Sequence, residues 1–324
     1  MAEMKYGSVP GVDKPVSRIV QGIIQISSGD EAKGFAQLDA ALEAGITAVD
    51  TAHVYGDKDA FLGKWIASRG VRDKVVVLAK GAHHNGVRKR VTPFDIEADL
   101  HDTLARMKTD YVDLYVLHRD DPDYPVEPIV DVLNKYQKAG KVGAFGGSNW
   151  TTERVAQANE YAAQSGQTPF AVSSPNFSLA DQVKEPWAGC VTISGPKNEA
   201  ARQWYAEHKT PLFTWSSMAG GFWSGRITRE TKDEFNEGLY KLAVECYASE
   251  DNFKRLDRAQ ELAQQKGLTV PQIALAYVFN YPLDIYALVG AEKPEEIAAN
   301  IVALNTTLTS PEMAYLDLRS DSLT

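Results

Sequence analysis

The chain has 324 residues, 44% of them hydrophobic, and its 34 lysines and arginines against 43 aspartates and glutamates give a formal net charge of -9 and a pI near 5.3. This acidic balance argues against nucleic acid or an anionic membrane surface as a partner. No stretch approaches the roughly 20 apolar residues of a membrane span, and the N-terminus has no apolar signal core, so we expect a soluble cytoplasmic protein. The length is typical of a single βα-type domain over residues 1–324.

The cysteine content indicates a reducing compartment. Cys190 and Cys246 are the only cysteines in the chain. Two cysteines are too few for a disulfide framework, and their separation does not match the spacing of metal ligands. We therefore expect both thiols to be reduced.

The first predicted element is a short hairpin. The segment from Lys5 to Lys14 contains the turn residues Gly7, Pro10 and Gly11, and such residues mark tight turns. The segment precedes the first long apolar run. We expect it to close the bottom of the domain that the following runs form.

Short β-branched runs then alternate with longer segments of helical periodicity, which is the pattern of parallel βα units. The eight runs are Ser17–Gly22, Ala48–Asp50, Val75–Lys80, Tyr111–His118, Val142–Ser148, Ala171–Ser174, Pro211–Ser216 and Tyr286–Gly290. Eight runs predict an α/β fold, a closed (β/α)8 TIM barrel. A doubly wound open sheet is the alternative, but the chain lacks the G-x-G-x-x-G turn with which such a sheet binds a dinucleotide.

Two segments between the runs show the outer helices most clearly. Asp95 to Met107 places its apolar residues on one helical face, and Phe253 to Lys266 is followed by Gly267, a residue typical of a helix C-terminus. The segment from Ala219 to Glu250 breaks the alternation and carries several glycines. Long insertions after a barrel strand are often lids or binding loops, and we expect this one to be such a loop.

Reactive side chains stand at the ends of three consecutive runs. Asp50, Lys80 and His118 each close a run, and Tyr55 follows the first of them. The carboxyl ends of the strands carry the active site in barrels of this type. A phenol, with a reference pKa of about 10, is a weak acid at neutral pH, but a nearby ammonium favours the phenolate, and a carboxylate keeps that ammonium charged. We predict a proton relay of Tyr55, Lys80 and Asp50, with His118 hydrogen-bonded to a substrate oxygen.

These motifs resemble those of the aldo-keto reductases. The stretch GITAVDTAHVYGDKDAFLG from Gly45 to Gly63 is similar to the family's first signature, and LARMKTDYVDLYVLH from Leu104 to His118 is similar to its second. The run VVVLAK supplies the strand-end lysine, and the similarity extends from about Ser17 to Leu304. The resemblance implies an NAD(P)(H)-dependent enzyme that reduces carbonyl compounds or oxidises alcohols without a metal. It also implies the catalytic tetrad Asp50, Tyr55, Lys80 and His118.

Two other motifs invite a different chemistry. His83 and His84 suggest a metal site, but adjacent histidines on a loop point in different directions and lack a carboxylate at ligand spacing, so we expect a solvated loop. The glycines of AGKVGAFGGSNW are not followed by the Lys-Ser/Thr of a phosphate-binding loop. We interpret Gly140 and Gly143 as a tight turn into the fifth run.

The resemblance also implies a cofactor site at the later strand ends. The family uses a Ser-Asn pair, here Ser148 and Asn149, to hold the nicotinamide carboxamide, and Ser174 stands where the family often has a glutamine. Trp215 occupies the position of an aromatic residue that stacks on the nicotinamide ring, although a core aromatic is the alternative interpretation. The segment from Ser216 to Gly221, including Gly220, is expected to offer backbone N–H groups to the pyrophosphate.

The segment VGAEKPEEIAAN, from Val289 to Asn300, resembles the family's adenosine-phosphate site. Family members that prefer NADP(H) place a basic residue at the position of Glu296 and often further basic groups near Gly290 and Glu292. The acidic residues here favour NAD(H), with NADP(H) as the alternative, and Asn300 matches a residue that contacts adenine. Pro294 followed by two glutamates is also ordinary helix-start chemistry.

The resemblance and the strand-end loops together indicate the substrate pocket. Arg119, Asp120 and Asp121 directly follow His118, and charged groups beside the reacting carbon suit a sugar or another polyhydroxylated carbonyl compound. The alternative is that Arg119 pairs with these aspartates at the barrel rim. The expected walls of the pocket are Ile24, Gln25, His53, Val54, Arg119, Trp150, Trp187 and Phe222.

Two classes of function follow from this sequence. The first is a catalytic oxidoreductase of carbohydrate metabolism acting on a small molecule. The second is a regulatory barrel that binds the nicotinamide cofactor and reports redox state to a partner. The complete tetrad favours the first. The sequence does not determine the oligomeric state, and a homo-oligomer is one possibility.

Overall fold

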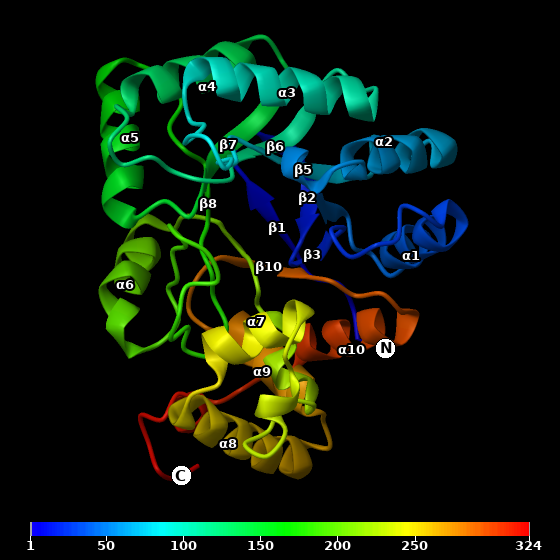
Figure 1. The fold of residues 1–324 in the computed structure, drawn as a ribbon, viewed down its shortest axis with the longest axis vertical. Coiled ribbons are helices and arrows are strands. Elements are labelled where there is room, and N and C mark those ends of the chain that lie inside the picture. Colours follow the sequence, from blue (N-terminus) through cyan, green and yellow to red (C-terminus); the bar gives the residue numbers. More distant parts are fainter. Residues whose placement is uncertain (1, 324) are drawn as a thin grey trace.

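The computed structural model describes residues 2–323 and has a closed barrel of eight parallel strands at its centre (Figure 1). Around the ring, β10 pairs with β3, and β4 to β9 follow in chain order until β9 pairs with β10. This confirms the predicted TIM barrel, and each strand agrees with its predicted run to within two residues at either end. The strands are β3 (Ile19–Gly22), β4 (Ala48–Asp50), β5 (Val76–Gly81), β6 (Val112–Leu117), β7 (Val142–Ser148), β8 (Val172–Ser174), β9 (Leu212–Thr214) and β10 (Ile285–Val289).

Helices surround the strands, as Figure 1 shows. In α3, Thr92 caps the first turn and Pro93 occupies the first helical position, while the apolar face predicted from the sequence is buried. α8 ends at Gly267, whose φ of 67° is left-handed. The helices are α1 (Glu31–Glu43), α2 (Lys58–Arg69), α3 (Pro93–Met107), α4 (Glu127–Lys138), α5 (Thr152–Gln164), α6 (Glu199–His208), α7 (Gly238–Tyr247), α8 (Glu250–Lys266), α9 (Val270–Asn280), α10 (Pro294–Asn305) and α11 (Ser310–Leu316).

The predicted hairpin closes the amino end of the barrel. Its strands β1 (Tyr6–Val9) and β2 (Val12–Ser17) are antiparallel. Val9 and Val16 are buried with the side chains that fill the barrel interior. Gly11 has a φ of 84°, and a Cβ there would lie 2.7 Å from the carbonyl oxygen of Gly143 at the start of β7. A glycine is therefore required at the point where the hairpin meets the barrel.

The segment from Ala219 to Glu250, expected to be a lid or binding loop, has a compact structure. It forms a 3₁₀ turn over Ala219–Ser224 followed by α7, and Phe222 and Trp223 are fully buried. The Phe222 ring lies 5.6 Å from that of Phe253 on α8. An apolar core thus fixes this segment to the barrel's outer helices.

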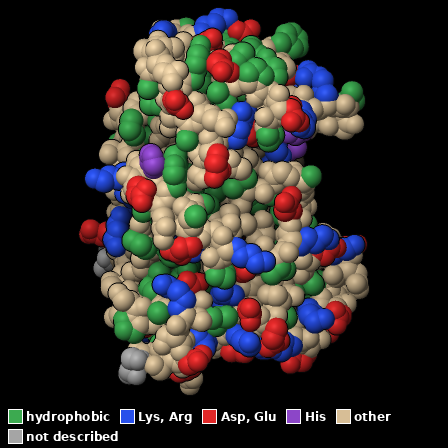
Figure 2. All heavy atoms as spheres, turned by 90° about the vertical axis from the view of Figure 1, so that its left-hand side faces the viewer, with side chains coloured by type: hydrophobic (Ala, Val, Ile, Leu, Met, Phe, Trp, Pro, Cys, Tyr) green, Lys and Arg blue, Asp and Glu red, His purple; other side chains and the backbone are tan. Residues whose placement is uncertain are grey.

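The surface carries both signs of charge. Figure 2 shows lysine and arginine side chains interspersed with aspartates and glutamates over the face that it displays. No helix within residues 2–323 is both long and apolar enough to span a membrane. Cys190 and Cys246 are buried free thiols.

Candidate active site

The four strand-end residues predicted to act together meet at the carboxyl ends of three neighbouring strands. Asp50 ends β4, Lys80 lies near the end of β5, and His118 follows β6 directly. Lys80 and Asp50 are both buried and form an ion pair. The ammonium of Lys80 lies 5.8 Å from the ring centroid of Tyr55. The imidazole of His118 meets the Tyr55 ring edge-on, with a distance of 5.8 Å between ring centroids.

Burial controls the protonation of these groups. It is the largest single influence on Lys80 and opposes its charge, but Asp50 and Tyr55 together outweigh it and raise the pKa of Lys80, so the side chain remains an ammonium. Burial, assisted by the charges of Lys80 and Arg119, holds the pKa of His118 well below its ordinary range, and the imidazole is neutral at neutral pH. Burial also raises the pKa of Tyr55, because desolvation outweighs the attraction of Lys80. This last shift is opposite to the one expected from the sequence, because the charges of Lys80 and Asp50 were considered there and the burial of the phenol was not.

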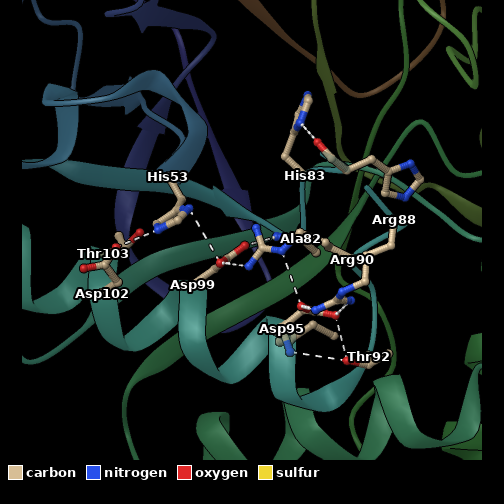
Figure 3. Close-up of polar contacts among 12 residues, drawn as sticks. His53, Ala82, His83, Arg88, Arg90, Thr92, Asp95, Asp99, Asp102 and Thr103 are labelled. Atoms are coloured by element: carbon tan, nitrogen blue, oxygen red, sulfur yellow. Dashed lines mark hydrogen bonds and ion pairs between the residues drawn. The ribbon is translucent and has the colours of Figure 1, made fainter. Parts of the chain in front are cut away.

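His53, which was expected at the substrate pocket, supports the turn that carries Tyr55. The two residues share a 3₁₀ turn over His53–Tyr55. Figure 3 shows the His53 ring between two carboxylates of α3. Its Nε2 lies 2.7 Å from Asp102 Oδ2, and its Nδ1 lies 3.6 Å from Asp99 Oδ1. α3 therefore fixes the turn from behind.

The same helix holds the loop after β5. Asp99 accepts a hydrogen bond of 2.8 Å from the backbone N–H of Ala82, two residues after Lys80, and forms an ion pair with Arg90 (Figure 3). Asp95 pairs with Arg88 and Arg90 on that loop. These acidic residues were not predicted as part of the site. The signal available in the sequence is their spacing of four and three residues, which places Asp95, Asp99 and Asp102 along one side of the predicted helix.

The charged run after His118 does not pair with itself, so the alternative interpretation of Arg119 is wrong. Asp120 accepts a hydrogen bond of 2.9 Å from Nε of Arg154, and Asp121 pairs with Lys89. Arg119 is only 6% exposed. Among residues 2–323 it has no carboxylate within ion-pair distance.

His83 is half-buried next to the catalytic candidates, whereas a solvated loop was expected there. Its Nδ1 lies 2.7 Å from the carbonyl oxygen of His84, its Nε2 lies 3.2 Å from Arg119, and its ring centroid lies 4.8 Å from that of His118. The described part of the chain contains no group of three or more His, Cys, Asp or Glu side chains arranged to hold a metal ion.

The residues predicted to hold the nicotinamide end of a cofactor lie together at the ends of β7 and β8. Ser148 and Ser174 are register partners, and the Ser148 hydroxyl donates to the Ser174 carbonyl oxygen at 2.9 Å. Asn149 has a left-handed φ of 60° and donates from Nδ2 to the carbonyl oxygen of His118 at 3.2 Å. The buried hydroxyl of Ser174 has no hydrogen-bond partner within residues 2–323. Such a group fits a carboxamide, which both donates and accepts.

Trp215 and the turn after it continue this side of the site. The Trp215 carbonyl oxygen accepts a hydrogen bond from Asn176, two residues beyond β8. The buried indole Nε1 of Trp215 has no hydrogen-bond partner in the described chain. The Trp215 ring stacks on Trp187 with a centroid distance of 5.6 Å. Ser216, Ala219, Gly220 and Gly221 all have positive φ. Left-handed residues in close succession turn backbone N–H groups toward one point, which fits a pyrophosphate.

The predicted adenosine-phosphate residues lie at the rim beside β10. Gly290 follows β10 directly, and Glu292 and Glu296 are exposed at the start of α10. A carboxylate oxygen of Glu296 accepts a hydrogen bond of 2.8 Å from the backbone N–H of Glu292. Glu296 thus has a capping contact of the kind that the alternative interpretation describes. Asn300 lies one turn further along α10 and is half-buried.

Three apolar pocket walls expected from the sequence are exposed, namely Ile24, Val54 and Trp187, and Gln25 is exposed as well. Trp150 and Phe222 are fully buried and line no pocket. The Trp150 indole packs on Phe170 and donates a hydrogen bond to the carbonyl oxygen of Arg119 at 3.2 Å. It supports the site from behind.

A closed βα barrel with these groups at its strand ends defines a class of enzyme, the TIM-barrel oxidoreductases that interconvert carbonyl compounds and alcohols. Within this class the chain belongs to the aldo/keto reductase family, whose model matches residues 18–319. Enzymes of this family use nicotinamide cofactors.

Several known proteins resemble the chain over most of its length. It is 27% identical to the aldo-keto reductase YhdN of Bacillus subtilis, over 95% of this chain and 91% of the relative. It is 25% identical to the aryl-alcohol dehydrogenase [NADP(+)] of Phanerodontia chrysosporium, over 95% of this chain and 83% of the relative. The structure of the glycerol dehydrogenase AKR11B4 of Gluconobacter oxydans matches with a TM-score of 0.75 at 22% identity, covering 98% of this chain and 94% of that one. At this identity the structural match supports the fold.

Proposed function

We propose that the protein is an NAD(P)(H)-dependent oxidoreductase that uses Tyr55 as general acid and base at the oxygen of its substrate. The observation that carries this proposal is the meeting of Tyr55, the Lys80–Asp50 ion pair and His118 at one end of the barrel. A regulatory barrel that only bound the cofactor would not need these four groups together. The enzyme interpretation is therefore favoured over a redox sensor.

The chemistry of the chain's own residues follows from their protonation. A bound nicotinamide cofactor would donate or accept the hydride. During carbonyl reduction, the Tyr55 hydroxyl donates its proton to the oxygen as that oxygen gains negative charge. Lys80 is held charged by Asp50 and stabilises the phenolate that remains. Neutral His118 donates a hydrogen bond to the same oxygen without competing for its proton.

The cofactor residues that we propose are Ser148, Asn149, Ser174, Trp215, Ser216, Gly220, Gly290, Glu292, Glu296 and Asn300. The unpartnered Ser174 hydroxyl and the left-handed turn after β9 support the nicotinamide and pyrophosphate ends of this site. The two exposed glutamates at α10 support a preference for NAD(H), because a 2′-phosphate would be repelled there and a ribose hydroxyl would not.

For the substrate we propose a polyhydroxylated carbonyl compound such as a sugar, held in part by the buried guanidinium of Arg119. An aryl aldehyde is the second candidate. It is supported by the exposed apolar side chains Ile24, Val54 and Trp187 at the strand-end loops and by the named activity of the Phanerodontia chrysosporium relative.

The test is a panel of aldoses, keto-sugars and aryl aldehydes assayed with purified protein and either reduced cofactor, followed at the absorbance of the reduced nicotinamide. We expect cofactor oxidation with at least one member of the panel and the reverse reaction with the matching alcohol. If the cofactor binds, as measured by calorimetry, but no member of the panel turns over, the redox-sensor interpretation replaces this one.

A further inference from the structure

Arg119 is a buried cation whose counter-charge is missing from the described chain. Four arginines in residues 2–323 are less than a tenth exposed. Arg154 and Arg202 form ion pairs with Asp120 and Glu199. Arg255 lies on the outer helix α8 and donates to the amide oxygen of Asn252. Of the four, Arg255 and Arg119 form no ion pair within residues 2–323, and only Arg119 lies at the strand ends, directly after His118.

The contacts of Arg119 leave part of its guanidinium unused. One terminal nitrogen donates to the carbonyl oxygen of His118 at 3.3 Å, and the other lies 3.2 Å from Nε2 of His83. Trp187 covers the guanidinium at 5.1 Å from its ring centroid. A guanidinium carries five N–H groups, so donors remain for a ligand.

His83 does not neutralise this charge. Its Nδ1 lies 2.7 Å from the carbonyl oxygen of His84, which can only accept, so Nδ1 carries the proton and Nε2 accepts from Arg119. The imidazole in this tautomer is neutral. Burial also lowers the pKa of His83, which agrees with the neutral form.

An uncompensated buried charge costs several kilocalories per mole, and proteins usually pair or solvate such a group. Arg119 sits where a substrate would bind, because a chain of contacts links it through His83 and His118 to Tyr55. An anionic group on the substrate would supply the missing charge. The planar fork of a guanidinium matches a carboxylate in both geometry and charge.

Resting on the function proposed above, we infer that Arg119 binds a carboxylate on the substrate and that the enzyme prefers carbonyl compounds bearing an acid group, such as sugar acids, to their neutral counterparts. One guanidinium and a neutral imidazole balance a single negative charge. A phosphate carries up to two charges and three oxygens, and Lys80 is already neutralised by Asp50. The carboxylate is therefore the better match.

Matched substrate pairs test this inference. D-glucuronate is compared with D-glucose, and 4-carboxybenzaldehyde with benzaldehyde, while glucose 6-phosphate reports on phosphate as the anion. We expect kcat/KM to be higher for the acid by about tenfold or more in at least one pair, the effect of one charge-assisted hydrogen bond. Equal values within both pairs overturn the inference but leave the proposed function standing, whereas inactivity with every compound overturns the function. A preference for the phosphate over the carboxylate also overturns the inference.

Two variants and a control separate recognition from structure. In Arg119→Gln the acid-to-neutral ratio of kcat/KM should fall to near one, mainly through KM, and Arg119→Lys should restore part of it. The control is Lys89→Gln, which removes an exposed charge that pairs with Asp121 and Asp123 on the same rim. Its ratio should stay within about twofold of wild type because exposed charges are screened. If Arg119→Gln lowers both members of each pair by the same factor, the arginine is only structural and the inference fails.

A binding measurement avoids any dependence on turnover. Benzoate and its neutral isostere benzamide are added to the protein saturated with oxidised cofactor, and the melting temperature is recorded. Benzoate should raise the melting temperature of wild type by mass action and should not raise that of Arg119→Gln. Equal stabilisation by benzoate and benzamide contradicts the carboxylate site.

Discussion

The two ends of the barrel differ in whether their buried charged groups are paired. At the amino end, Asp113 lies 2.7 Å from Lys14 of the hairpin and 2.8 Å from Arg72, and it also accepts the backbone N–H of Val77 at 2.9 Å. Arg18 pairs with Asp284 at the same end. At the carboxyl end, Arg119 is buried without a carboxylate in residues 2–323, and the Ser174 hydroxyl has no hydrogen-bond partner there.

The backbone differs between the ends in the same way. Seven residues other than glycine have positive φ in the described chain. Lys108 and Lys209 follow helices directly and Leu318 lies two residues after α11, whereas the other four, Ala82, Asn149, Ser216 and Ala219, lie beyond the ends of β5, β7 and β9. Strained backbone and unpaired polar groups persist where function requires them and the surrounding fold supports them. The amino end stabilises the barrel, and the carboxyl end holds groups ready for ligands.

The largest expected effect is at the carboxyl end. Tyr55→Phe should lower kcat by about 100-fold or more, because the proton is needed only as the carbonyl oxygen becomes an alkoxide. Cofactor affinity should stay within a few-fold, since ground-state binding does not use this proton. Steady-state kinetics and calorimetry measure the two effects. Tyr161→Phe on α5, which removes a hydroxyl bonded to Asp131, is the control and should behave as wild type. A Tyr55→Phe enzyme that keeps more than about a tenth of wild-type kcat contradicts the assignment of the acid.

A pair of substitutions tests the contrast in stability directly. Asp113→Asn leaves Lys14 and Arg72 without their carboxylate and should cost about 3 kcal/mol, the low end for breaking a buried pair because both cations are partly exposed. Arg119→Met removes an unpaired charge and should cost no stability. Urea unfolding of both variants gives the comparison. A large loss for Arg119→Met would mean that its charge is compensated in the free protein, and the contrast between the ends would be wrong.

The third effect concerns the cofactor. Wild type should favour NAD(H) over NADP(H) in kcat/KM by roughly ten- to a hundredfold, since making or losing one charge-assisted hydrogen bond accounts for such a ratio. Glu296→Arg should reverse the preference. Glu292→Gln is a useful comparison because it removes a second carboxylate and leaves the backbone N–H that Glu296 accepts. If wild type works better with NADPH, the hydrogen bond of Glu296 with the Glu292 backbone is its whole role, and the tyrosine assignment is unaffected.

The sequence predicted the barrel well because each strand is a short apolar run with its own boundaries. It also predicted which side chains lie at the carboxyl ends of β4, β5 and β6, since the strand ends fix their place in a parallel barrel. The sequence did not predict which side chains from distant elements would contact one another. His53 turns toward Asp99 and Asp102, and Asp120 turns toward Arg154, each a contact between elements more than thirty residues apart.

The sequence also did not predict in which direction the loop side chains point. Trp150 and Phe222 follow strand ends and looked like pocket walls, yet each fills an apolar space between the barrel and its outer helices. Arg119 was predicted near the substrate, but its lack of a partner follows only from the structure. The two aspartates that follow Arg119 in the sequence were its expected partners, but Asp120 pairs with Arg154 and Asp121 pairs with Lys89.

The smallest predicted effect is a dependence of stability on pH that originates at the carboxyl end. Burial and the charges of Lys80 and Arg119 hold the folded-state pKa of His118 well below its ordinary range. In the unfolded chain a histidine has a pKa of about 6.5, so below that pH the unfolded state binds a proton that the folded state refuses. The stabilisation is therefore complete above about pH 6.5 and is lost as the pH falls, by about 1.4 kcal/mol per pH unit.

Replacing His118 removes its contribution to the pH dependence of stability and leaves the contributions of the other titratable groups unchanged. Between pH 7.5 and pH 5.0, wild type should lose more of its unfolding free energy than His118→Gln, by up to about 2 kcal/mol, because roughly 1.5 pH units of that interval lie below the unfolded-state pKa. Urea titrations at the two pH values give the difference. His208→Gln replaces an exposed histidine on α6 and should lose as much as wild type. If His118→Gln loses the same free energy as wild type and His208→Gln, His118 takes up its proton in the folded protein as readily as in the unfolded chain. The lowered pKa of His118 would then be wrong, and its imidazole would become charged below about pH 6.5, although the role of Tyr55 would not depend on it.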